Sequence, residues 1–353
     1  MNNYDNKIIQ DDMKLLLKSG IDFEKLNQKT IFITGSTGML ASYIVYFLIF
    51  LNENIENFSC NIILQVRNIE KCKQRFGKYI DKNYIEIYEG NIIDEIKIDI
   101  KIDFIIHAAS IAMTQIFKEY PIDVALPNTM GTYRLLELAV KNNIESFLYF
   151  STCSIYGKIE DRESISEDDY GILDPLDINS CYSESKRFGE TLCRAYWNQK
   201  RVPTKMVRIS HTYGPTIELD KDNRVFSDFV RNILNEENIV LKSNGKAKRS
   251  FCYITDATEA FLKILLNGKN GEAYNMSNPY ENISILELAE RLVKKCEDKK
   301  IKIVTKESIK ENYTENKFSN EVYFSIEKTK GLGWVPKISI EDGFEKTVNS
   351  FKV

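Results

Sequence analysis

The feature that most constrains the fold is an apolar run that passes through a glycine turn into a second apolar run. Residues Thr30 to Thr34 have the composition of a strand, and Gly35-Ser36-Thr37-Gly38-Met39 follows them at once. The stretch from Met39 to Leu51 carries no charge and is too short to span a bilayer, which takes about 20 residues. A strand, a tight turn and a buried helix in this order predict the first unit of a parallel α/β sheet.

The same alternation continues through the first half of the chain. Strands separated by helices form a parallel sheet that is covered on both faces. We therefore predict an α/β fold: a Rossmann-type doubly wound parallel sheet with a smaller C-terminal substrate-binding domain. The sequence predicts further strands at 61–66, 84–88, 103–107, 146–151 and 204–210, and helices at 69–75, 122–142 and 180–199.

Composition excludes several classes of function. The formal net charge is -3 with both signs interspersed, which leaves no basic stripe for nucleic acid and no polybasic face for a membrane. The seven cysteines are scattered without a CxxC pair, so neither a disulfide framework nor a metal site is indicated. The polar start, Met1 to Gln10, lacks the apolar core of a signal peptide. We expect a cytoplasmic protein with reduced thiols.

The glycine turn is suited to a dinucleotide. Glycines between a strand and a helix let backbone N–H groups approach a pyrophosphate at the helix N-terminus. A tight turn also needs glycine for steric reasons alone, so the motif acquires meaning from its context. Ala41 stands where a third glycine is often found. The candidate cofactor-binding residues here are Gly35, Ser36, Thr37, Gly38 and Met39.

A tyrosine and a lysine lie one turn apart in the predicted helix 180–199. Tyr182 and Lys186 share one face of that helix. A nearby ammonium favours phenolate and lowers the pKa of a tyrosine from about 10, which would let it exchange a proton with a hydroxyl or carbonyl. Such pairs are common in helices, where most of them are structural.

Hydroxyl groups cluster where the predicted strand 146–151 ends. Thr152 and Ser154 lie in the segment Phe150 to Gly157. Ligands bind at the carboxyl ends of strands in open α/β sheets, so these hydroxyls could bond a reacting oxygen. Alternatively, they cap backbone groups at a strand end.

These three elements, in this order and spacing, resemble the extended short-chain dehydrogenase/reductase family, specifically its nucleotide-sugar epimerases, dehydratases and decarboxylases. The resemblance covers nearly the whole chain. From Cys181 to Asp256 it is most similar to the UDP-glucuronate decarboxylases, in CYSESKRFGETLC, RISHTYGP, RVFSDFVRNIL and KRSFCYITD. It also includes the segments His107-Ala108-Ala109-Ser110, Asn128-Thr129-Met130-Gly131-Thr132, Arg249-Ser250-Phe251 and Tyr274-Asn275-Met276-Ser277-Asn278.

The resemblance implies a catalytic role for three residues. Tyr182 would be the general acid or base, Lys186 would lower its pKa and hold the cofactor ribose, and Thr152 would bond the sugar oxygen at C4. Ala108 and Ala109 would lie against the cofactor.

The resemblance also implies how the substrate is held. Arg249 would meet the diphosphate as a planar, permanently charged donor, unless it is only a surface charge. Val225 would lie near the nucleobase. Ser154 and His211 would contact the sugar or phosphate, although His211 replaces the asparagine usual in the family and could be a buried core residue. The implied ligand is a nucleoside-diphosphate sugar, with UDP favoured, and the implied assembly is a homodimer through helices that include the one carrying Tyr182.

Two departures from the family pattern bear on the reaction. Cys153 and Ser154 stand where dehydratases place an acidic pair and decarboxylases an acid, which disfavours 4,6-dehydration and weakens decarboxylation. Arg67 and Asn68 follow the second strand, where members that use NAD carry Asp or Glu. An arginine there can accommodate the 2′-phosphate of NADP, unless it is a solvated loop residue.

The boundaries that follow are an N-terminal helical extension at 1–28, in which Asp11 to Leu26 has helical spacing, a dinucleotide-binding domain at 29–214 and a nucleotide-sugar-binding domain at 215–353. The second domain should contain helices near 224–236 and 284–296 and strands near 239–242 and 250–254. The chain is expected to return to the first domain near 256–270.

We predict an NADP(H)-dependent enzyme acting at C4 of a nucleotide sugar, with reduction of a nucleoside-diphosphate 4-keto sugar as the leading hypothesis. NADP(H) is favoured and NAD(H) is possible. The alternatives are a nucleotide-sugar 4-epimerase, a UDP-glucuronate decarboxylase and a non-catalytic dinucleotide-binding sensor. The presence of Thr152, Tyr182 and Lys186 argues against the sensor, since such proteins typically lose the Tyr–Lys pair.

Overall fold

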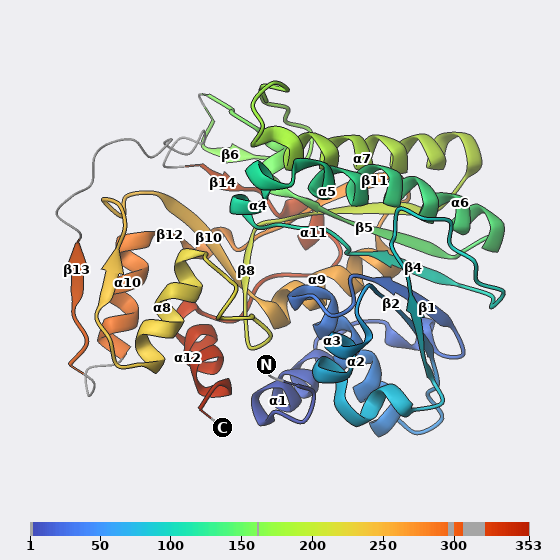
Figure 1. Ribbon diagram of the computed structural model, residues 1–353, viewed down its shortest axis with the longest axis horizontal. Coiled ribbons are helices and arrows are strands. Elements are labelled where there is room, and N and C mark those ends of the chain that lie inside the picture. Colours follow the sequence, from blue (N-terminus) through green and yellow to red (C-terminus); the bar gives the residue numbers. More distant parts are fainter. Residues whose placement is uncertain (1–2, 161, 296–299, 306–321, 353) are drawn as a thin grey trace.

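A seven-stranded parallel sheet forms the centre of the molecule (Figure 1). The computed structural model describes residues 3–160, 162–295, 300–305 and 322–352. The strand order β11-β7-β5-β4-β1-β2-β3 is that of a doubly wound sheet, so the predicted fold class is confirmed. The strands are β1 (Thr30–Thr34), β2 (Asn61–Val66), β3 (Ile85–Glu89), β4 (Phe104–His107), β5 (Ser146–Thr152), β7 (Thr204–Ile209) and β11 (Glu272–Met276).

Helices cover both faces of this sheet, as Figure 1 shows. Side chains of β1 alternate between the two resulting cores: Ile31 and Ile33 pack with α2 (Met39–Asn54), whereas Phe32 packs with α6 (Thr132–Asn142). Helix α2 is apolar all round because nearly every residue from Ala41 to Leu51 is buried. The second face is also covered by α5 (Pro121–Leu126) and α7 (Ser180–Lys200).

Some predicted elements have different limits in the structure. The N-terminal helix α1 spans Lys7–Leu17 rather than 11–26; Gly20 follows with φ +78°, and Phe23–Leu26 is a separate 3-10 turn. The predicted helix 122–142 is interrupted by a π-helical turn at Pro127–Gly131. Proline supplies no N–H to the helical ladder, which explains the change of winding there. The short helices α3 (Ile69–Phe76) and α4 (Thr114–Glu119) complete this part of the chain.

The later part of the chain builds a smaller layer beside the main sheet (Figure 1). Strands β8, β10 and β12 form a three-stranded sheet, and Tyr213, Phe251 and Phe344 pack over it. Strands β8 and β11 were not predicted. The elements are β8 (His211–Tyr213), α8 (Val225–Leu234), β9 (Ile239–Leu241), β10 (Lys248–Tyr253), β12 (Asn282–Ser284), α10 (Ile285–Lys295), β13 (Ile303–Thr305) and α12 (Ile340–Ser350).

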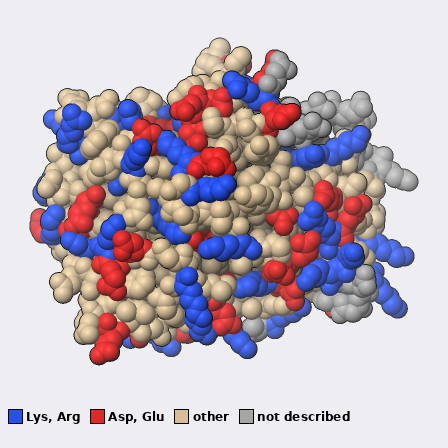
Figure 2. All heavy atoms as spheres, turned by 180° about the vertical axis from the view of Figure 1, so that it is seen from behind, with Lys and Arg blue, Asp and Glu red and all other residues tan. Residues whose placement is uncertain are grey.

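Helix α9 (Ile254–Asn267) follows β10 directly and packs against β5 and α2 of the main sheet. Three short elements lie near β11: the paired strands β6 (Ser164–Ile165) and β14 (Tyr323–Phe324), and the helix α11 (Glu327–Lys330). Within the described ranges, no helix combines the length and apolarity that crossing a bilayer requires. On the face in Figure 2, cationic and anionic side chains are interspersed, as the net charge of -3 would suggest.

A buried carboxylate joins the N-terminal helix to both layers. Asp12 has no exposed surface, and its carboxylate accepts hydrogen bonds from the hydroxyls of Tyr43 (2.5 Å) and Tyr253 (2.7 Å). Its other oxygen pairs with the ammonium of Lys346 at 2.6 Å. These partners come from α2, β10 and α12, so one side chain connects three elements that are far apart in sequence. The carboxylate is satisfied by two donors and one cation, as a buried charge must be.

Replacing Asp12 by Leu should destabilise the protein by about 3–5 kcal/mol, because a half-buried ammonium and two buried phenols lose their shared partner. Urea unfolding followed by circular dichroism measures the change. Asp11→Ala is the matched control: Asp11 is partly exposed, and within the described ranges its one ion pair is with Lys14. The free energy of unfolding should therefore change by less than about 0.5 kcal/mol. Equal stability of the two variants would contradict the connecting role of Asp12.

Candidate functional site

The glycine turn after β1 lies directly against the end of β4. Gly35 has φ +61°, and a Cβ added there would lie 2.8 Å from the Cα of Ala109. A Cβ at Gly38 would lie 3.1 Å from the carbonyl oxygen of Gly35. Glycine is thus required twice over at position 35, for its left-handed backbone and for the close approach of two chain segments.

A pocket of about 260 Å³ opens beside this turn. It contains seven of the predicted cofactor-binding residues: Gly35, Thr37, Gly38, Arg67, Asn68, Ala108 and Ala109. Sequence reasoning missed the other residues that line it, although most of them follow strand ends, a signal that could have identified them. They are Gln65, Val66, Lys71, Asn91, Ile92, Ser110, Ile111 and Pro127.

Two predicted cofactor residues support the turn from behind rather than lining the pocket. The buried hydroxyl of Ser36 donates to the carbonyl of Gln65 at 3.3 Å. The carbonyl of Met39 accepts a hydrogen bond from the hydroxyl of Thr216 at 3.1 Å. The fully buried Arg75 donates to the carbonyl of Thr37 (3.3 Å), so the turn is fixed on its protein side and its other side faces the pocket.

A buried histidine sets the end of β4. Burial lowers the pKa of His107 to about 3, so its ring is neutral. The carbonyl of Pro127 can only accept, so Nε2 donates to it (3.2 Å) and Nδ1 accepts from the hydroxyl of Thr34 (2.9 Å). The oxygen of Thr34 in turn accepts from the backbone N–H groups of Ala108 and Ala109. His107 and Thr34 thereby shape the pocket wall.

The pocket is cationic at the end of β2. Arg67 is exposed, and no hydrogen bond or ion pair within the described chain holds its guanidinium. Lys71 lies one turn further on and pairs with Glu218 at 2.6 Å. Among the described residues that line the pocket, two are cationic and none carries a carboxylate. Such a lining favours an anionic group at this end.

The predicted catalytic tyrosine and threonine come together at the end of β5. Burial raises the pKa of Tyr182 to about 12, and the hydrogen bond with Thr152 and the positive charge of Arg224 oppose this rise. The ring of Phe117 stacks on Tyr182 with centroids 4.9 Å apart. The hydroxyl of Thr152 also donates to that of Ser154 at 3.3 Å. A phenol and two hydroxyls therefore meet at the carboxyl edge of the sheet.

Lys186 is differently placed from what the sequence predicted. Its ammonium donates to the carbonyl of Phe150 at 2.5 Å and lies 4.8 Å from the ring centroid of Tyr149. Burial lowers the pKa of Lys186 to about 7. The contributions that lower the pKa of Tyr182 come from Thr152 and Arg224, not from Lys186, because the ammonium is turned toward the strand backbone.

The predicted substrate residues lie in the smaller layer. His211 is exposed on β8 beside Phe251, with ring centroids 6.1 Å apart, and Arg249 is half-buried on β10. Val225 begins α8. Sequence reasoning placed the 224–230 stretch near the nucleobase but did not single out Arg224. This residue precedes α8, pairs with Asp222 at 2.5 Å and is near enough to Tyr182 to act on its pKa. Its place beside Val225 in the segment RVFSDFVRNIL was the available signal.

The family of this chain follows from comparison with known proteins. The model of the "NAD dependent epimerase/dehydratase family" matches residues 31–277, which span the glycine turn, Thr152, Tyr182 and the start of the smaller layer. The chain belongs to this family. Its curated relatives include nucleotide-sugar enzymes that it covers over most of their length.

Two groups of curated relatives share more than a quarter of their residues with the chain. The dTDP-D-glucose 4,6-dehydratase of Homo sapiens is 27% identical over 336 residues, with 92% of this chain and 90% of the relative covered. UDP-glucuronic acid decarboxylase 5 of Arabidopsis thaliana is 29% identical over 324 residues, with 92% and 89% covered. Both matches include the dinucleotide half and the smaller layer.

Solved structures show the same fold. UDP-glucose 4-epimerase of Thermotoga maritima superposes with a TM-score of 0.76 at 22% identity, covering 92% of this chain and 98% of the epimerase. UDP-glucuronic acid 4-epimerase of Bacillus cereus, in complex with UDP-glucuronic acid and NAD, gives a TM-score of 0.74 at 22% identity, covering 92% and 99%. At this identity the likeness concerns the fold alone.

Replacing Gly35 by Ala should weaken dinucleotide binding by at least about 100-fold, because the new Cβ would push the turn away from Ala109. Fluorescence titration with a reduced dinucleotide measures the affinity. Gly77→Ala is the matched control, since Gly77 also has positive φ (+56°) but a Cβ there meets nothing within 4 Å. Both variants carry backbone strain, so similar losses of affinity would mean that the close approach at Gly35 has no part in binding.

Proposed function

We propose that this protein is a nucleotide-sugar oxidoreductase that acts at C4 of the sugar, with reduction of a nucleoside-diphosphate 4-keto sugar by NADPH as its reaction. The observation that carries the proposal is the meeting of Tyr182 and Thr152 at the sheet edge that also bears the dinucleotide pocket. Lys186 from the same helix lies one turn away. A site for proton transfer thus adjoins a site for a hydride donor.

The residues present fit a dinucleotide. Gly35 leaves space that a Cβ would fill, the turn opens α2, and the described residues lining the pocket add two cations. When bound, the nicotinamide would supply or accept the hydride at C4. The residues that would hold the dinucleotide are Gly35, Thr37, Gly38, Arg67, Asn68, Lys71, Ala108 and Ala109.

Tyr182 and Thr152 would bind the sugar oxygen at C4 and supply its proton. Because burial raises the pKa of Tyr182 to about 12, the phenol keeps its proton at neutral pH and can donate it to an oxygen at C4. The hydroxyl of Thr152, shared with Ser154, is placed to hydrogen-bond the same oxygen. Loss of a proton to the C4 oxygen leaves a phenolate, which the charge of Arg224 and the hydroxyl of Thr152 would stabilise.

The lining of the pocket favours NADP(H) over NAD(H). Arg67 follows β2, where a carboxylate would receive the ribose hydroxyls of NAD, and its guanidinium has no partner within the described chain. Lys71 adds a second positive charge. A 2′-phosphate would be attracted by both side chains, and no carboxylate among the described lining residues would repel it.

The alternative reactions use the same residues. A 4-epimerase needs the keto intermediate to turn over before it is reduced again. Decarboxylation is favoured by the 29% identity with UDP-glucuronic acid decarboxylase 5, and this likeness also supports UDP as the nucleotide. The lack of a carboxylic acid after Thr152 argues against decarboxylation and 4,6-dehydration. Ser154 has a hydroxyl instead, and burial keeps the pKa of the Cys153 thiol well above its usual range.

The exposed face of α5, the π-helical turn, α6 and α7 supports a homodimer. Five large apolar side chains are exposed there, which is unusual for a surface that faces only water. We therefore assign this face, with the helix that carries Tyr182, to contact with a second copy. The five are Ile122, Met130, Tyr133, Val140 and Phe188.

In this proposal, each of the two main parts of the chain binds a different ligand. Residues 29–214 bind the dinucleotide, with support from α9 behind the sheet, and residues 215–353 bind the nucleotide sugar through Val225, Arg249 and the neighbouring His211. The N-terminal helix α1 contacts both parts through Asp12, which binds Tyr43 of the first and Lys346 of the second.

Tyr182→Phe should abolish turnover while leaving the dinucleotide affinity within about threefold, because the variant lacks only the proton that is transferred. The assay is loss of NADPH absorbance with a panel of nucleoside-diphosphate 4-keto sugars. Phe117→Leu, which removes the stacked ring but no proton donor, is the control and should retain measurable activity. Unchanged turnover in Tyr182→Phe would rule out the mechanism.

Arg67→Asp should lower the ratio of NADPH to NADH affinity by at least about 100-fold, because it exchanges a cation for a carboxylate that can accept from ribose hydroxyls. Binding is measured for both reduced dinucleotides by fluorescence. Lys73→Ala serves as control, since Lys73 is exposed and pairs with Glu70 away from the pocket. A wild-type protein that prefers NADH would overturn the cofactor assignment and favour the epimerase or decarboxylase.

A further inference from the structure

A buried ion pair lies behind the site, away from the dinucleotide pocket. Arg208 on β7 and Glu190 on α7 are both less than a tenth exposed. The guanidinium binds the carboxylate through two nitrogens, with Nη2 2.8 Å from one oxygen and Nε 3.1 and 3.3 Å from the two oxygens. This bidentate arrangement fixes the direction of both side chains.

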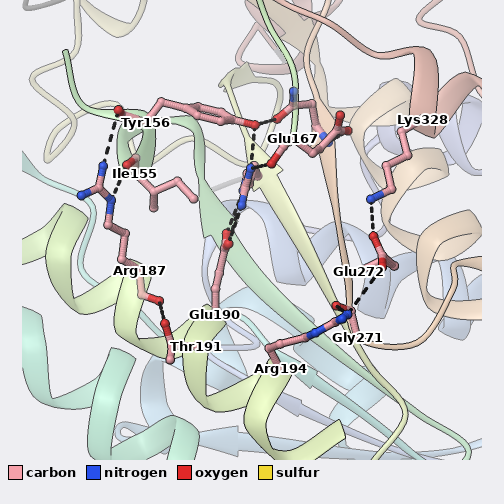
Figure 3. A network of polar contacts seen from close by, with 12 residues as sticks. Ile155, Tyr156, Glu167, Arg187, Glu190, Thr191, Arg194, Gly271, Glu272 and Lys328 are labelled. Atoms are coloured by element: carbon pink, nitrogen blue, oxygen red, sulfur yellow. Dashed lines mark hydrogen bonds and ion pairs between the residues drawn. The ribbon is translucent and has the colours of Figure 1, made fainter. Parts of the chain in front are cut away.

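The same guanidinium also binds the turn that follows β5. Its Nη1 donates to the hydroxyl of Tyr156 at 2.9 Å, and the backbone carbonyl of Arg208 accepts from the thiol of Cys153 at 3.4 Å. Tyr156 donates in turn to Asn275 of β11 at 2.6 Å. In Figure 3, Tyr156, Glu167 and Glu190 converge on this point from three different elements.

A second arginine holds this turn to α7 from the other side. The Nε of Arg187 donates to the carbonyl of Ile155 at 2.6 Å, and its Nη2 donates to the carbonyl of Gly171 at 2.8 Å (Figure 3). The turn Cys153–Tyr156 is therefore bound to β7 and α7 by the side chains of Arg208 and Arg187.

The contacts close a ring through the catalytic residues. On α7, Tyr182, Lys186 and Glu190 follow one another at intervals of one turn and share a face. Thr152 immediately precedes the turn that ends with Tyr156. On one side of the ring, Thr152 lies near enough to Tyr182 to lower the pKa of its phenol, and on the other side contacts run from Tyr156 through Arg208 to Glu190.

We propose that Arg208 and Glu190 are positioning residues that hold the turn bearing Thr152 at a fixed distance and angle from Tyr182. The inference rests on the proposed function for what the two catalytic residues do. A buried ion pair is weak evidence for stability, because a well-packed apolar pair would serve as well. An apolar pair, however, would not fix the direction of three elements through bidentate hydrogen bonds.

Glu190 has a second effect on the site. Its negative charge opposes the burial that lowers the pKa of Lys186. Without Glu190, the pKa of Lys186 would fall further, so Lys186 would lose its proton at a lower pH. Removing the Glu190 charge therefore has a pH signature at Lys186.

The decisive variant replaces both partners by apolar residues, Arg208→Met with Glu190→Leu. We expect it to fold, because no unpaired charge is left buried. Affinities for NADPH and for UDP should stay within about threefold, whereas kcat should fall by about 100-fold, since a displacement of about 1 Å at a reacting group has that effect. Arg194→Met is the matched control: Arg194 joins α7 to Gly271 and Glu272 but does not touch the turn, so its kcat should be that of the wild type (Figure 3).

Glu190→Gln is the second variant: its amide oxygen can still accept from Arg208, although the buried guanidinium loses its countercharge and the protein loses stability. It keeps the shape of the side chain and removes the charge, so the limb of the pH–rate profile that reports Lys186 should move to lower pH. A double variant with wild-type kcat, or an unchanged profile in Glu190→Gln, would overturn the proposal. A parallel loss of UDP affinity and kcat would overturn it as well, because the ring would then support binding rather than the reacting groups.

A readout without substrate separates this inference from the proposed function. The thiol of Cys153 is buried and bonded to Arg208, so alkylation by iodoacetamide, located by peptide mass spectrometry, reports opening of the turn. The double variant should be labelled at least about tenfold faster than the wild type and the Arg194→Met control. If the wild type turns over none of the sugars, the proposed reaction fails while this measurement still decides whether the ring holds the turn.

Discussion

The parallel register of the central strands is the constraint on which the site depends. Thr34 of β1 lies beside His107 of β4, and Thr152 of β5 lies beside Ile209 of β7, so four strands end at one edge. All seven strands run in the same direction, which places every carboxyl end on that side of the sheet. The glycine turn, the pocket wall and the hydroxyls of Thr152 and Tyr182 therefore lie at the same edge although they are far apart in the sequence.

Buried polar groups make this edge rigid. His107 is neutral and joins Thr34 to Pro127, Gln65 lies under the glycine turn and donates to Gly90 at 2.6 Å, and Arg208 connects β7 to α7 and to the turn after β5. Each of these groups is satisfied by directed hydrogen bonds, which apolar packing would not provide. The apolar cores on the two faces stabilise the sheet, whereas these polar contacts fix the positions of its strand ends.

The charges around the site are divided by role. Cations at the end of β2 face the pocket, and Arg224 and Arg249 lie on the side of the smaller layer, where a diphosphate would be expected. The reacting groups themselves are less charged: the phenol of Tyr182 is protonated, Ser154 replaces an acid, and burial lowers the pKa of Lys186 to about 7. This division is consistent with a hydride transfer assisted by one proton donor, and it does not favour chemistry that needs a carboxylate base.

The sequence alone determined the order of strands and helices around the glycine turn, because local apolar periodicity and turn residues act over a few positions. It therefore identified the doubly wound sheet, the residues Gly35 to Gly38 and the pair Tyr182 and Lys186. It did not determine the direction of the Lys186 ammonium, the position of Lys71 in the pocket lining, or the contact of Arg208 with Glu190 and Tyr156. These depend on the register between distant strands and on burial, which exist only once the sheet has closed against its helices.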